Sequence, residues 1–388
     1  MKYCLRVPRI LLPESGFEKW SVIACDQFTS DPSYWERVRK TVGNAPSSLN
    51  MILPEIYLGE DDEGRIAEIH ENMYAALENG YISKLNRGCV LCERTTVSGV
   101  RRGIVAAIDL EAYTTERGET SPIRSSEAVV PSRLPARVAV RKGAPLEFPH
   151  AMIFYRDKKD KIMRMLAEED LEVLYDFELM EGGGRLKGSF VPEYFAEEAL
   201  RMMHGKDEPS FAVADGNHSV AAAKAYWEEI KTGLTEEEIR NHPARFTLVE
   251  LVNLYDEAVA FHPIHRLLKE TDAEAFCSYF MNAVKCRRVG NVLRPALPAD
   301  ASAVEKTDRL IEEFVRVNGG KIDYIHGDDN LIAFAAQEDC AGVMLKPIEK
   351  DGFFERLKGG GNFPKKTFSV GEDTEKRYYT EGREIGYD

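Results

Sequence analysis

The sequence ADGNHSVAAAKAYW, residues 214–227, brings a carboxylate, a carboxamide, an imidazole and a hydroxyl together within a few positions. The apolar run FAVA that leads into it is typical of the end of a strand, and the alanine-rich stretch that follows is typical of a helix. A helix start presents unpaired N–H groups and the positive end of the helix dipole, which together favour a phosphate group. We therefore predict an anion site at this strand-to-helix corner, formed by Gly216, Asn217, His218 and Ser219.

The functional interpretation of this corner gives Asp215 two roles, as a catalytic carboxylate and as a ligand of Mg²⁺, and it makes His218 a donor to the bound anion. An alternative stays open, because Asp215, Asn217 and Ser219 are all residue types that cap helix starts. Gly216 allows backbone conformations that other residues resist. The corner can therefore also be a capped helix without a ligand.

A second candidate is the basic segment SPIRSSEAVVPSRLPARVAVRKG, residues 121–143. We predict that Arg124 binds phosphate, because the guanidinium fork matches phosphate oxygens. Glu127 lies among the arginines of this segment, and their charges would keep it ionised, as a general base must be. The alternative is a loop whose charges are simply solvated.

Two further basic stretches carry predicted phosphate- or nucleotide-binding residues. FHPIHRLL contains His265 and Arg266, and GGGNFPKKTFS contains Lys366 and Thr367. The second stretch does not have the spacing of the GxxxxGK[ST] phosphate loop. A surface His–Arg pair and a turn with solvated lysines are the respective alternatives.

Composition disfavours several classes of function. A net charge of −14 disfavours a nucleic-acid-binding protein, which needs a basic surface. No apolar run approaches the roughly 20 residues of a membrane span. The seven cysteines are thinly scattered, and the CxxC formed by Cys89 and Cys92 lacks the second half of a zinc site. We expect a cytoplasmic protein with strand cysteines at these two positions.

The elements that must position these residues are of mixed type. Helices are predicted at 65–78, 191–203, 272–285 and 302–317, and strands at 89–97, 102–110, 136–141, 151–156, 245–254, 331–336 and 341–346. They do not alternate as in a Rossmann or barrel fold, so the expected class is α+β (irregular α/β) with mixed sheets and helices. We expect an N-terminal α/β region at 1–112, a core domain at 113–270, and a C-terminal α+β region at 271–388 whose FPKKT tail contributes to the site.

Taken in order, these stretches resemble the domain-of-unknown-function 1015 family of bacteria and archaea. The matching motifs are Ile-Arg-x-x-Glu at Ile123, Arg124 and Glu127, Pro-His at Pro149 and His150, the Ala-Asp-Gly corner at Ala214, Asp215 and Gly216, Pro-x-His-Arg at Pro263, His265 and Arg266, and Pro-x-Lys-[Ser/Thr] at Pro364, Lys366 and Thr367. The central motif is also similar to that of the ParB–sulfiredoxin-like superfamily, which includes partitioning nucleotidases, sulfiredoxin and a free-serine kinase. This resemblance implies a ParB–sulfiredoxin-like core in which the DGNHS corner grips nucleotide phosphates.

The corner departs from the superfamily motif at two positions, because Asn217 stands where the motif has a first His and Ser219 where it has Arg. Loss of that Arg removes a bidentate phosphate clamp, so Arg124, Arg266 or Lys366 would have to bind phosphate instead. The motif contains no Cys, which sulfiredoxin chemistry needs, and the chain shows no helix-turn-helix pattern.

Together these features predict an enzyme that binds ATP or ADP with Mg²⁺ and transfers phosphate to a small hydroxyl-bearing metabolite, as a small-molecule kinase does. In this hypothesis Glu127, Asp215 and His218 are catalytic. The first alternative is a non-catalytic nucleotide- or anion-sensing protein on the same fold. The second is a structural protein whose corner is only a helix cap. The expected partner is a small-molecule or nucleotide ligand, with no nucleic acid and no membrane.

Overall fold

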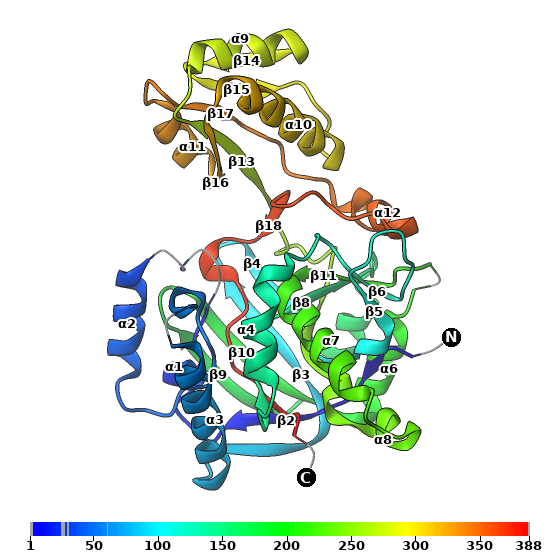
Figure 1. The fold of residues 1–388 in the computed structure, drawn as a ribbon. Coiled ribbons are helices and arrows are strands. Elements are labelled where there is room, and N and C mark those ends of the chain that lie inside the picture. The colour runs from blue at the N-terminus through cyan, green and yellow to red at the C-terminus, as the bar shows by residue number, and fades with distance from the viewer. Residues whose placement is uncertain (1–2, 25–27, 29–30, 60, 206, 387–388) are drawn as a thin grey trace. The chain divides into compact units, whose positions relative to one another are not determined.

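The computed structural model describes residues 3–24, 28, 31–59, 61–205 and 207–386, which group into two compact units. Unit 1 consists of Met1–Val259 and Asp373–Asp388, and unit 2 consists of Ala260–Glu372 (Figure 1). Unit 2 is thus an insertion between two parts of unit 1. The three regions expected from the sequence stay a prediction, and the first two of them share the large sheet of unit 1.

Unit 1 is built on an eleven-stranded sheet with the strand order β5-β6-β11-β8-β12-β4-β3-β10-β9, in which β1 pairs with β4 and β2 with β3. The strands are β1 (Leu5–Arg6), β2 (Arg9–Pro13), β3 (Ile82–Thr96), β4 (Gly99–Asp109), β5 (Tyr113–Thr114), β6 (Ile123–Ser125), β8 (Met152–Tyr155), β9 (Val173–Leu179), β10 (Gly184–Pro192), β11 (Phe211–Asp215) and β12 (Phe246–Asn253). The pairs β5–β6, β6–β11 and β8–β12 are parallel, and the other neighbours are antiparallel. The mixed sheet expected from the sequence is confirmed.

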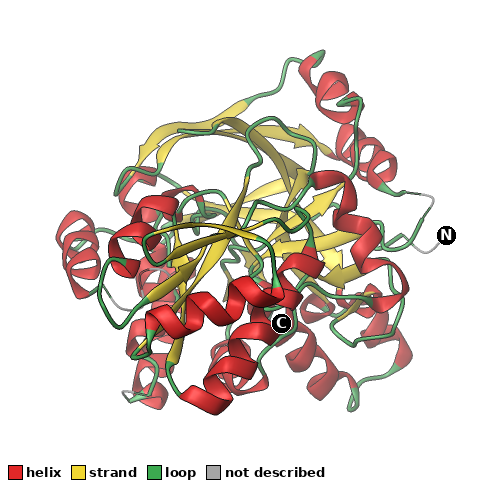
Figure 2. Ribbon diagram, turned by 90° about the horizontal axis from the view of Figure 1, so that it is seen from above, coloured by secondary structure: helices red, strands yellow, loops and turns green. Residues whose placement is uncertain are grey.

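Both faces of this sheet carry an apolar core, because side chains alternate between the faces along each strand. Val105 belongs to one core and its neighbour Ile104 to the other. The first core includes residues of α1 (Phe17–Trp20), α2 (Pro32–Val42) and α3 (Asp62–Glu78). The second includes residues of α5 (Lys161–Ala167), α6 (Glu193–Met203) and α7 (Asn217–Lys231). The helices are coloured red in Figure 2.

Unit 1 also contains two short helices and a second sheet. They are α4 (Leu134–Arg141), α8 (Glu236–Asn241) and a two-stranded sheet of β7 (Leu146–Glu147) and β19 (Arg383–Glu384). Glu147 of β7 is a buried carboxylate that accepts hydrogen bonds from Arg141, Arg383 and the backbone N–H of Leu248. Burial by itself would raise the pKa of Glu147, but the two guanidinium groups outweigh burial and hold the pKa below its ordinary value.

The C-terminal segment of unit 1, residues 373–386, is largely buried although it follows the inserted unit 2. The backbone N–H of Tyr379 donates to the carbonyl oxygen of Val22 at 2.8 Å. Trp20 donates its indole N–H to the carbonyl oxygen of Thr380 at 3.0 Å. These bonds join the end of the chain to its beginning, so the core of unit 1 is complete only when the last residues are in place.

Unit 2 has a six-stranded sheet with the order β14-β15-β17-β13-β16, and β18 pairs with β13. Its elements are β13 (Phe261–Lys269), α9 (Ala273–Ala283), β14 (Cys286–Val289), β15 (Val292–Pro295), α10 (Ala301–Asn318), β16 (Lys321–His326), α11 (Asp328–Ala335), β17 (Ala341–Val343), α12 (Phe353–Leu357) and β18 (Phe368–Val370). Leu268 packs in a core with α9 and α10, whereas Leu267 packs in another core with α11. The sheet of unit 2 is therefore also covered on two faces.

Most of the elements predicted from the sequence are confirmed, but two are wrong. The predicted helices at 65–78, 191–203, 272–285 and 302–317 are α3, α6, α9 and α10. The predicted strand at 136–141 instead makes up most of α4, which has Pro135 in its first turn. The predicted strand at 331–336 lies in α11. Both stretches are short, and a short apolar run does not distinguish a strand from a buried helix turn.

Within the described residues, the helices do not combine the length and apolar character that a membrane-spanning segment needs. Cys89 and Cys92 lie buried in β3, as predicted, while Cys25 lies outside the described residues.

Candidate functional site

The predicted strand-to-helix corner is confirmed, and a glycine makes it possible. β11 ends at Asp215 and α7 begins at Asn217. Gly216 between them has φ 79° and ψ 26°, in the left-handed region that residues with a side chain rarely adopt. A Cβ atom at Gly216 would also lie 2.9 Å from the Cα atom of Ala151. The turn therefore requires glycine for two independent reasons, its backbone conformation and its close approach to the chain before β8.

The polar side chains at this corner do not cap α7. Its N-cap residue is Gly216, and the helix start has no side-chain cap hydrogen bond. Asp215 accepts a hydrogen bond from the N–H of Gly216 at 3.0 Å, and Ser219 Oγ lies 3.5 Å from His150 Nε2. The N–H of Ser219 donates to the carbonyl oxygen of Gly216. It is therefore not directed to a ligand, contrary to the expectation that Ser219 helps to form the anion site. The capped-helix interpretation is wrong for these side chains.

Asn217 and His218 instead hold the loop that follows β6. Asn217 Oδ1 accepts hydrogen bonds from Ser125 Oγ at 2.7 Å and from the N–H of Ser126 at 3.2 Å. His218 Nε2 accepts a hydrogen bond from the N–H of Val130 at 3.1 Å. An acceptor Nε2 assigns a neutral imidazole with its proton on Nδ1. The first turn of α7 thus fixes both ends of the short loop that contains Glu127.

A lysine from the C-terminal segment lies at the same corner. Lys376 Nζ is 3.5 Å from Asp215 Oδ2, and the lysine side chain is only 7% exposed. The ring of Tyr379, from the same segment, packs against the ring of His150 at a centroid distance of 4.8 Å. The corner therefore combines a helix start with a nearly buried ammonium group, two imidazoles and a carboxylate.

Arg124 makes its contacts with a neighbouring loop. It is fully buried in β6, and its Nη1 donates to the carbonyl oxygens of Glu116 and Glu119 at 2.6 Å each. Burial lowers the pKa of this guanidinium. Ser125, the next residue, contacts Asn217, and successive side chains of a strand point to opposite faces. The hydrogen bonds of Arg124 thus order the loop at 116–119.

The four predicted site residues of unit 2 lie close to one another within that unit. Arg266 is fully buried and forms a double hydrogen bond with Asp308 at 2.6 and 2.9 Å, and its Nη1 donates to the carbonyl oxygen of Lys366 at 2.8 Å. Thr367 Oγ1 donates to the carbonyl oxygen of Pro364 at 2.6 Å. Arg266 thus shapes the turn that carries Lys366 and Thr367.

His265 of unit 2 is also engaged through both ring nitrogens. Its Nε2 is 2.9 Å from Asp328 Oδ1, and its Nδ1 accepts a hydrogen bond from the N–H of Leu345 at 3.2 Å. Burial lowers the pKa of His265, against the opposing effect of Asp328. A role in ligand binding for His265, Arg266, Lys366 and Thr367 stays a prediction, and so does their convergence with the residues of unit 1.

Metal binding at Asp215 also stays a prediction. In the part of the chain that the structure describes, no group of three or more His, Cys, Asp or Glu side chains is arranged to hold a metal ion. Mg²⁺ at nucleotide sites is usually bound by one or two carboxylates together with phosphate oxygens. Asp215 offers one carboxylate beside a helix start, and that carboxylate faces Lys376.

A buried ion cluster lies beside this corner and was not predicted from the sequence. Arg377, next to Lys376, lies between two buried carboxylates, with its Nη1 3.1 Å from Glu250 Oε2 and its Nη2 bonded to Glu381. Tyr175 donates its hydroxyl to Glu381. The available signal was Glu250 itself, a carboxylate in the middle of the apolar strand TLVELV. Its partner, however, is more than a hundred residues away in the tail.

The sequence profile described as "Protein of unknown function (DUF1015)" matches residues 9–338. This covers most of the chain. The chain belongs to the DUF1015 family. None of the curated protein sequences matches it. The matched range of this DUF1015 protein includes Arg124, Glu127 and the corner at 215–219, whereas Lys366 and Lys376 lie beyond it.

Three solved structures are similar to this DUF1015 protein at low identity. A conserved hypothetical protein from Pyrococcus furiosus is 12% identical with a TM-score of 0.36, over 71% of this chain and 94% of that chain. Free serine kinase in complex with AMP is 12% identical with a TM-score of 0.37, over 71% and 90%. A variant of that kinase in complex with ADP is 12% identical with a TM-score of 0.37, over 71% of this chain and 91% of that chain. At such TM-scores the shared arrangement is loose, so no ligand or residue role passes to this protein.

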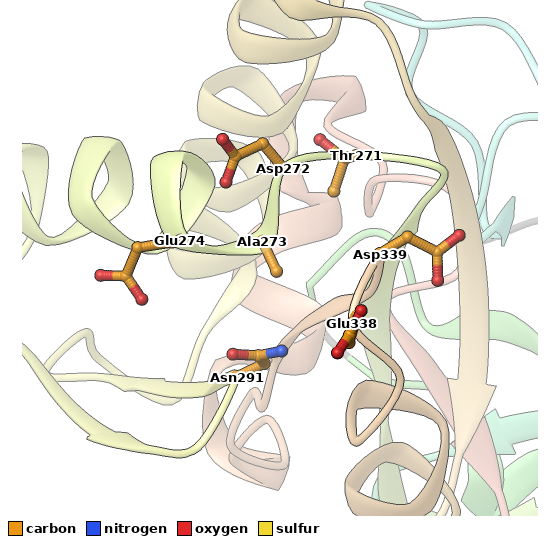
Figure 3. A pocket seen from close by; sticks show the side chains of 7 residues that line it. All are labelled: Thr271, Asp272, Ala273, Glu274, Asn291, Glu338 and Asp339. Atoms are coloured by element: carbon orange, nitrogen blue, oxygen red, sulfur yellow. The ribbon is translucent and has the colours of Figure 1, made fainter.

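A pocket in unit 2 of this DUF1015 protein is lined largely by acidic side chains (Figure 3). Its lining includes Asp272, Glu274, Glu338 and Asp339. Asp272 caps α9 by accepting from the N–H of Ala275, and Glu274 pairs with Arg288. In Figure 3 the carboxylates of Glu274 and Asp339 point away from each other. A lining of carboxylates repels phosphate, so the corner of unit 1 is the better candidate for an anion site.

Proposed function

We propose that unit 1 binds a nucleotide through its phosphate groups at the start of α7, and that the protein transfers phosphate to a small hydroxyl-bearing metabolite. The observation that carries this proposal is the helix start itself. Gly216 leaves the cap position without a side chain, while Asp215, Asn217 and Ser219 contact other groups. The N–H groups at the start of an α-helix point outward along its axis, and the helix dipole adds to their attraction for phosphate.

In this proposal the residues around α7 have separate roles in phosphoryl transfer. The reaction needs positioning and charge neutralisation more than covalent chemistry. The amides of Asn217 and His218 bind phosphate oxygens. Glu127, on the loop that the side chains of Asn217 and His218 hold, accepts the proton of the acceptor hydroxyl. The acceptor oxygen then bonds to the terminal phosphorus, the bridging P–O bond breaks, and the nucleotide leaves with one phosphate fewer. A well-placed general base contributes about 10²- to 10⁴-fold in rate.

Asp215 would hold the Mg²⁺ that accompanies ATP or ADP, and the ion would supply charge neutralisation on the phosphates. His218, neutral and with its proton on Nδ1, orients the phosphate or the acceptor while its Nε2 stays on Val130. Because the imidazole also holds the loop, His218→Gln should affect both binding and turnover.

A second candidate function is a nucleotide- or anion-sensing protein without catalysis. One observation favours it, because Asp215 faces the ammonium group of Lys376 at 3.5 Å. A carboxylate paired with a lysine attracts Mg²⁺ less strongly, since part of its charge is already balanced. The two functions differ in turnover, because both require nucleotide binding and only the first releases a phosphorylated product.

The experiment that tests the proposal starts with thermal unfolding of the full chain with ATP, ADP, CTP or pyrophosphate, each with and without Mg²⁺. A ligand at 100 times its Kd should add about 2.7 kcal/mol to the free energy of unfolding. A bound nucleotide is then tested for phosphate transfer to a panel of amino acids, sugars and polyols. Binding without any product would support the sensor, and no binding of any of the four ligands would refute both functions.

Glu127→Gln separates the roles further, because it keeps the size of the side chain and removes its basicity. It should lower turnover at least about 100-fold while nucleotide affinity stays within a factor of about three. Glu116→Gln is the matched control, since Glu116 is an exposed carboxylate on the neighbouring loop that Arg124 holds. Equal turnover in Glu127→Gln and wild type would remove Glu127 from the catalytic assignment.

A further inference from the structure

The C-terminal segment brings a cation to the corner from a part of the chain that the family profile does not reach. Lys376 Nζ is 3.5 Å from Asp215 Oδ2, and Asp215 is the last residue before the glycine at the helix start. The lysine side chain is 7% exposed. In such a poorly hydrated place, the attraction between an ammonium group and a phosphate is stronger than at an exposed surface.

The backbone on both sides of this lysine is held by buried arginines. Arg94 is 2% exposed, and it donates to the carbonyl oxygens of Thr374 at 2.6 Å, Lys376 at 3.2 Å and Gly183 at 2.7 Å. Arg377 follows Lys376 directly and bonds to Glu250 and Glu381. The guanidinium groups of Arg94 and Arg377 therefore fix the backbone position from which the side chain of Lys376 extends.

Arg377 keeps its charge in this buried place because of its two partners. Burial by itself would lower the pKa of Arg377, but the carboxylates of Glu381 and Glu250 outweigh it and raise the pKa above its ordinary value. Glu250 packs closely against Gly103, where an added Cβ atom would lie only 2.3 Å from Glu250 Oε1. The triad of Glu250, Arg377 and Glu381 is thus a tightly packed anchor under the segment.

We propose that Lys376 is a phosphate-binding residue of the α7 site and that the triad of Glu250, Arg377 and Glu381 positions it. The inference rests on the proposed function, since it adds a cation to the same site. Asp215 holds the ammonium group in place until the phosphate arrives beside it. The ligand class that this arrangement suits is a polyanion, a nucleoside diphosphate or triphosphate, rather than a neutral nucleoside.

The test measures the Kd of ADP and of inorganic pyrophosphate by calorimetry on the full chain. Lys376→Gln should weaken both about 10- to 100-fold, as loss of a charged hydrogen bond predicts, while Lys376→Arg should stay within about threefold of wild type. Lys231→Gln is the matched control, because Lys231 pairs with Glu111 at the other end of α7. It should leave both Kd values unchanged.

The positioning role requires a double-mutant cycle, because a residue that acts only through Lys376 has no effect once Lys376 is gone. Glu250→Gln should weaken ADP binding, and Glu250→Gln combined with Lys376→Gln should bind no more weakly than Lys376→Gln alone. If Glu250→Gln fails to fold, Arg377→Lys replaces it in the cycle, since it keeps the charge and loses the fork.

The outcomes separate this inference from the proposed function. Wild-type protein that binds neither probe overturns the proposed function, and the inference with it. Wild-type binding that Lys376→Gln leaves unchanged overturns the inference alone. Additive losses in the cycle overturn the positioning role of the triad.

Discussion

Gly216→Ala is the perturbation whose cost is most directly set by the structure. Alanine at this position must adopt φ near 79°, which costs an L-residue about 1–2 kcal/mol. Its Cβ atom would also lie 2.9 Å from both the Cα and the Cβ atoms of Ala151. Relieving such a contact by backbone movement costs about 1–3 kcal/mol. The substitution should therefore lower the free energy of unfolding by about 2–5 kcal/mol.

Urea unfolding followed by circular dichroism measures this change, and Gly233→Ala is the matched control. Gly233 follows the other end of α7, and a Cβ atom there would lie 3.8 Å from the carbonyl oxygen of Ile230, which is ordinary contact. The control should be neutral or stabilising by up to about 1 kcal/mol. A loss below about 1 kcal/mol in Gly216→Ala would refute the geometry of the corner. Backbone movement at the corner should also weaken pyrophosphate binding.

Three further predictions concern buried side chains that stabilise unit 1. Glu147→Gln should cost about 3–5 kcal/mol at neutral pH because it leaves the buried Arg383 and the partly buried Arg141 without their carboxylate. The pKa of Glu147 is lowered, so its contribution to stability is present above pH 4.5 and is lost as pH falls. The variant should therefore lose less stability than wild type at acid pH in urea titrations, and an unchanged acid limb would contradict the assignment. Burial raises the pKa of the Cys4 thiol from 9.0 to about 12, so its contribution to stability is lost as pH rises from about 9 towards 12. Iodoacetamide at pH 8 should alkylate Cys4 only when urea unfolds the protein, which mass spectrometry of the Cys4 peptide can measure. Trp20→Phe removes the donor to the Thr380 carbonyl and should cost about 1–3 kcal/mol, whereas an unchanged urea midpoint would show that the C-terminal segment is not anchored there.

The corner could be predicted from the sequence because its signals are local. A short apolar run, a glycine and an alanine-rich stretch within fifteen residues are enough to place a strand, a tight turn and a helix. The role of the polar residues was not predictable in the same way. Asn217 and Ser219 looked like caps, yet Asn217 contacts Ser125 and Ser219 lies beside His150, and both contacts depend on chain that is distant in sequence.

The basic residues show why charge alone is a weak guide to a site. Phosphate binding by Arg124 and Arg266 stays a prediction, and in the structure both side chains are buried and donate to carbonyl oxygens, with Arg266 also bonded to Asp308. A buried guanidinium group can equally well stabilise a loop, because its five N–H donors can form hydrogen bonds with several carbonyl groups at once. Sequence spacing contains no information about which of these uses a fold makes of it.

The buried anchor of the tail was the hardest feature to predict. Glu250 in an apolar strand signals a buried partner of opposite charge, because an isolated buried carboxylate is too costly. The partner, Arg377, follows an insertion of more than a hundred residues, and many arginines compete for the assignment. Only the three-dimensional return of the C-terminal segment to unit 1 identifies the pair.

Phosphate binding at the start of α7 can be observed by NMR titration of the ¹⁵N-labelled full chain with pyrophosphate. The backbone amide signals of Asn217 and His218 should shift most, together with those around Lys376, and the shifts should saturate with a single Kd. Shifts confined to unit 2, or no saturable shift at residues 215–219, would contradict the claim.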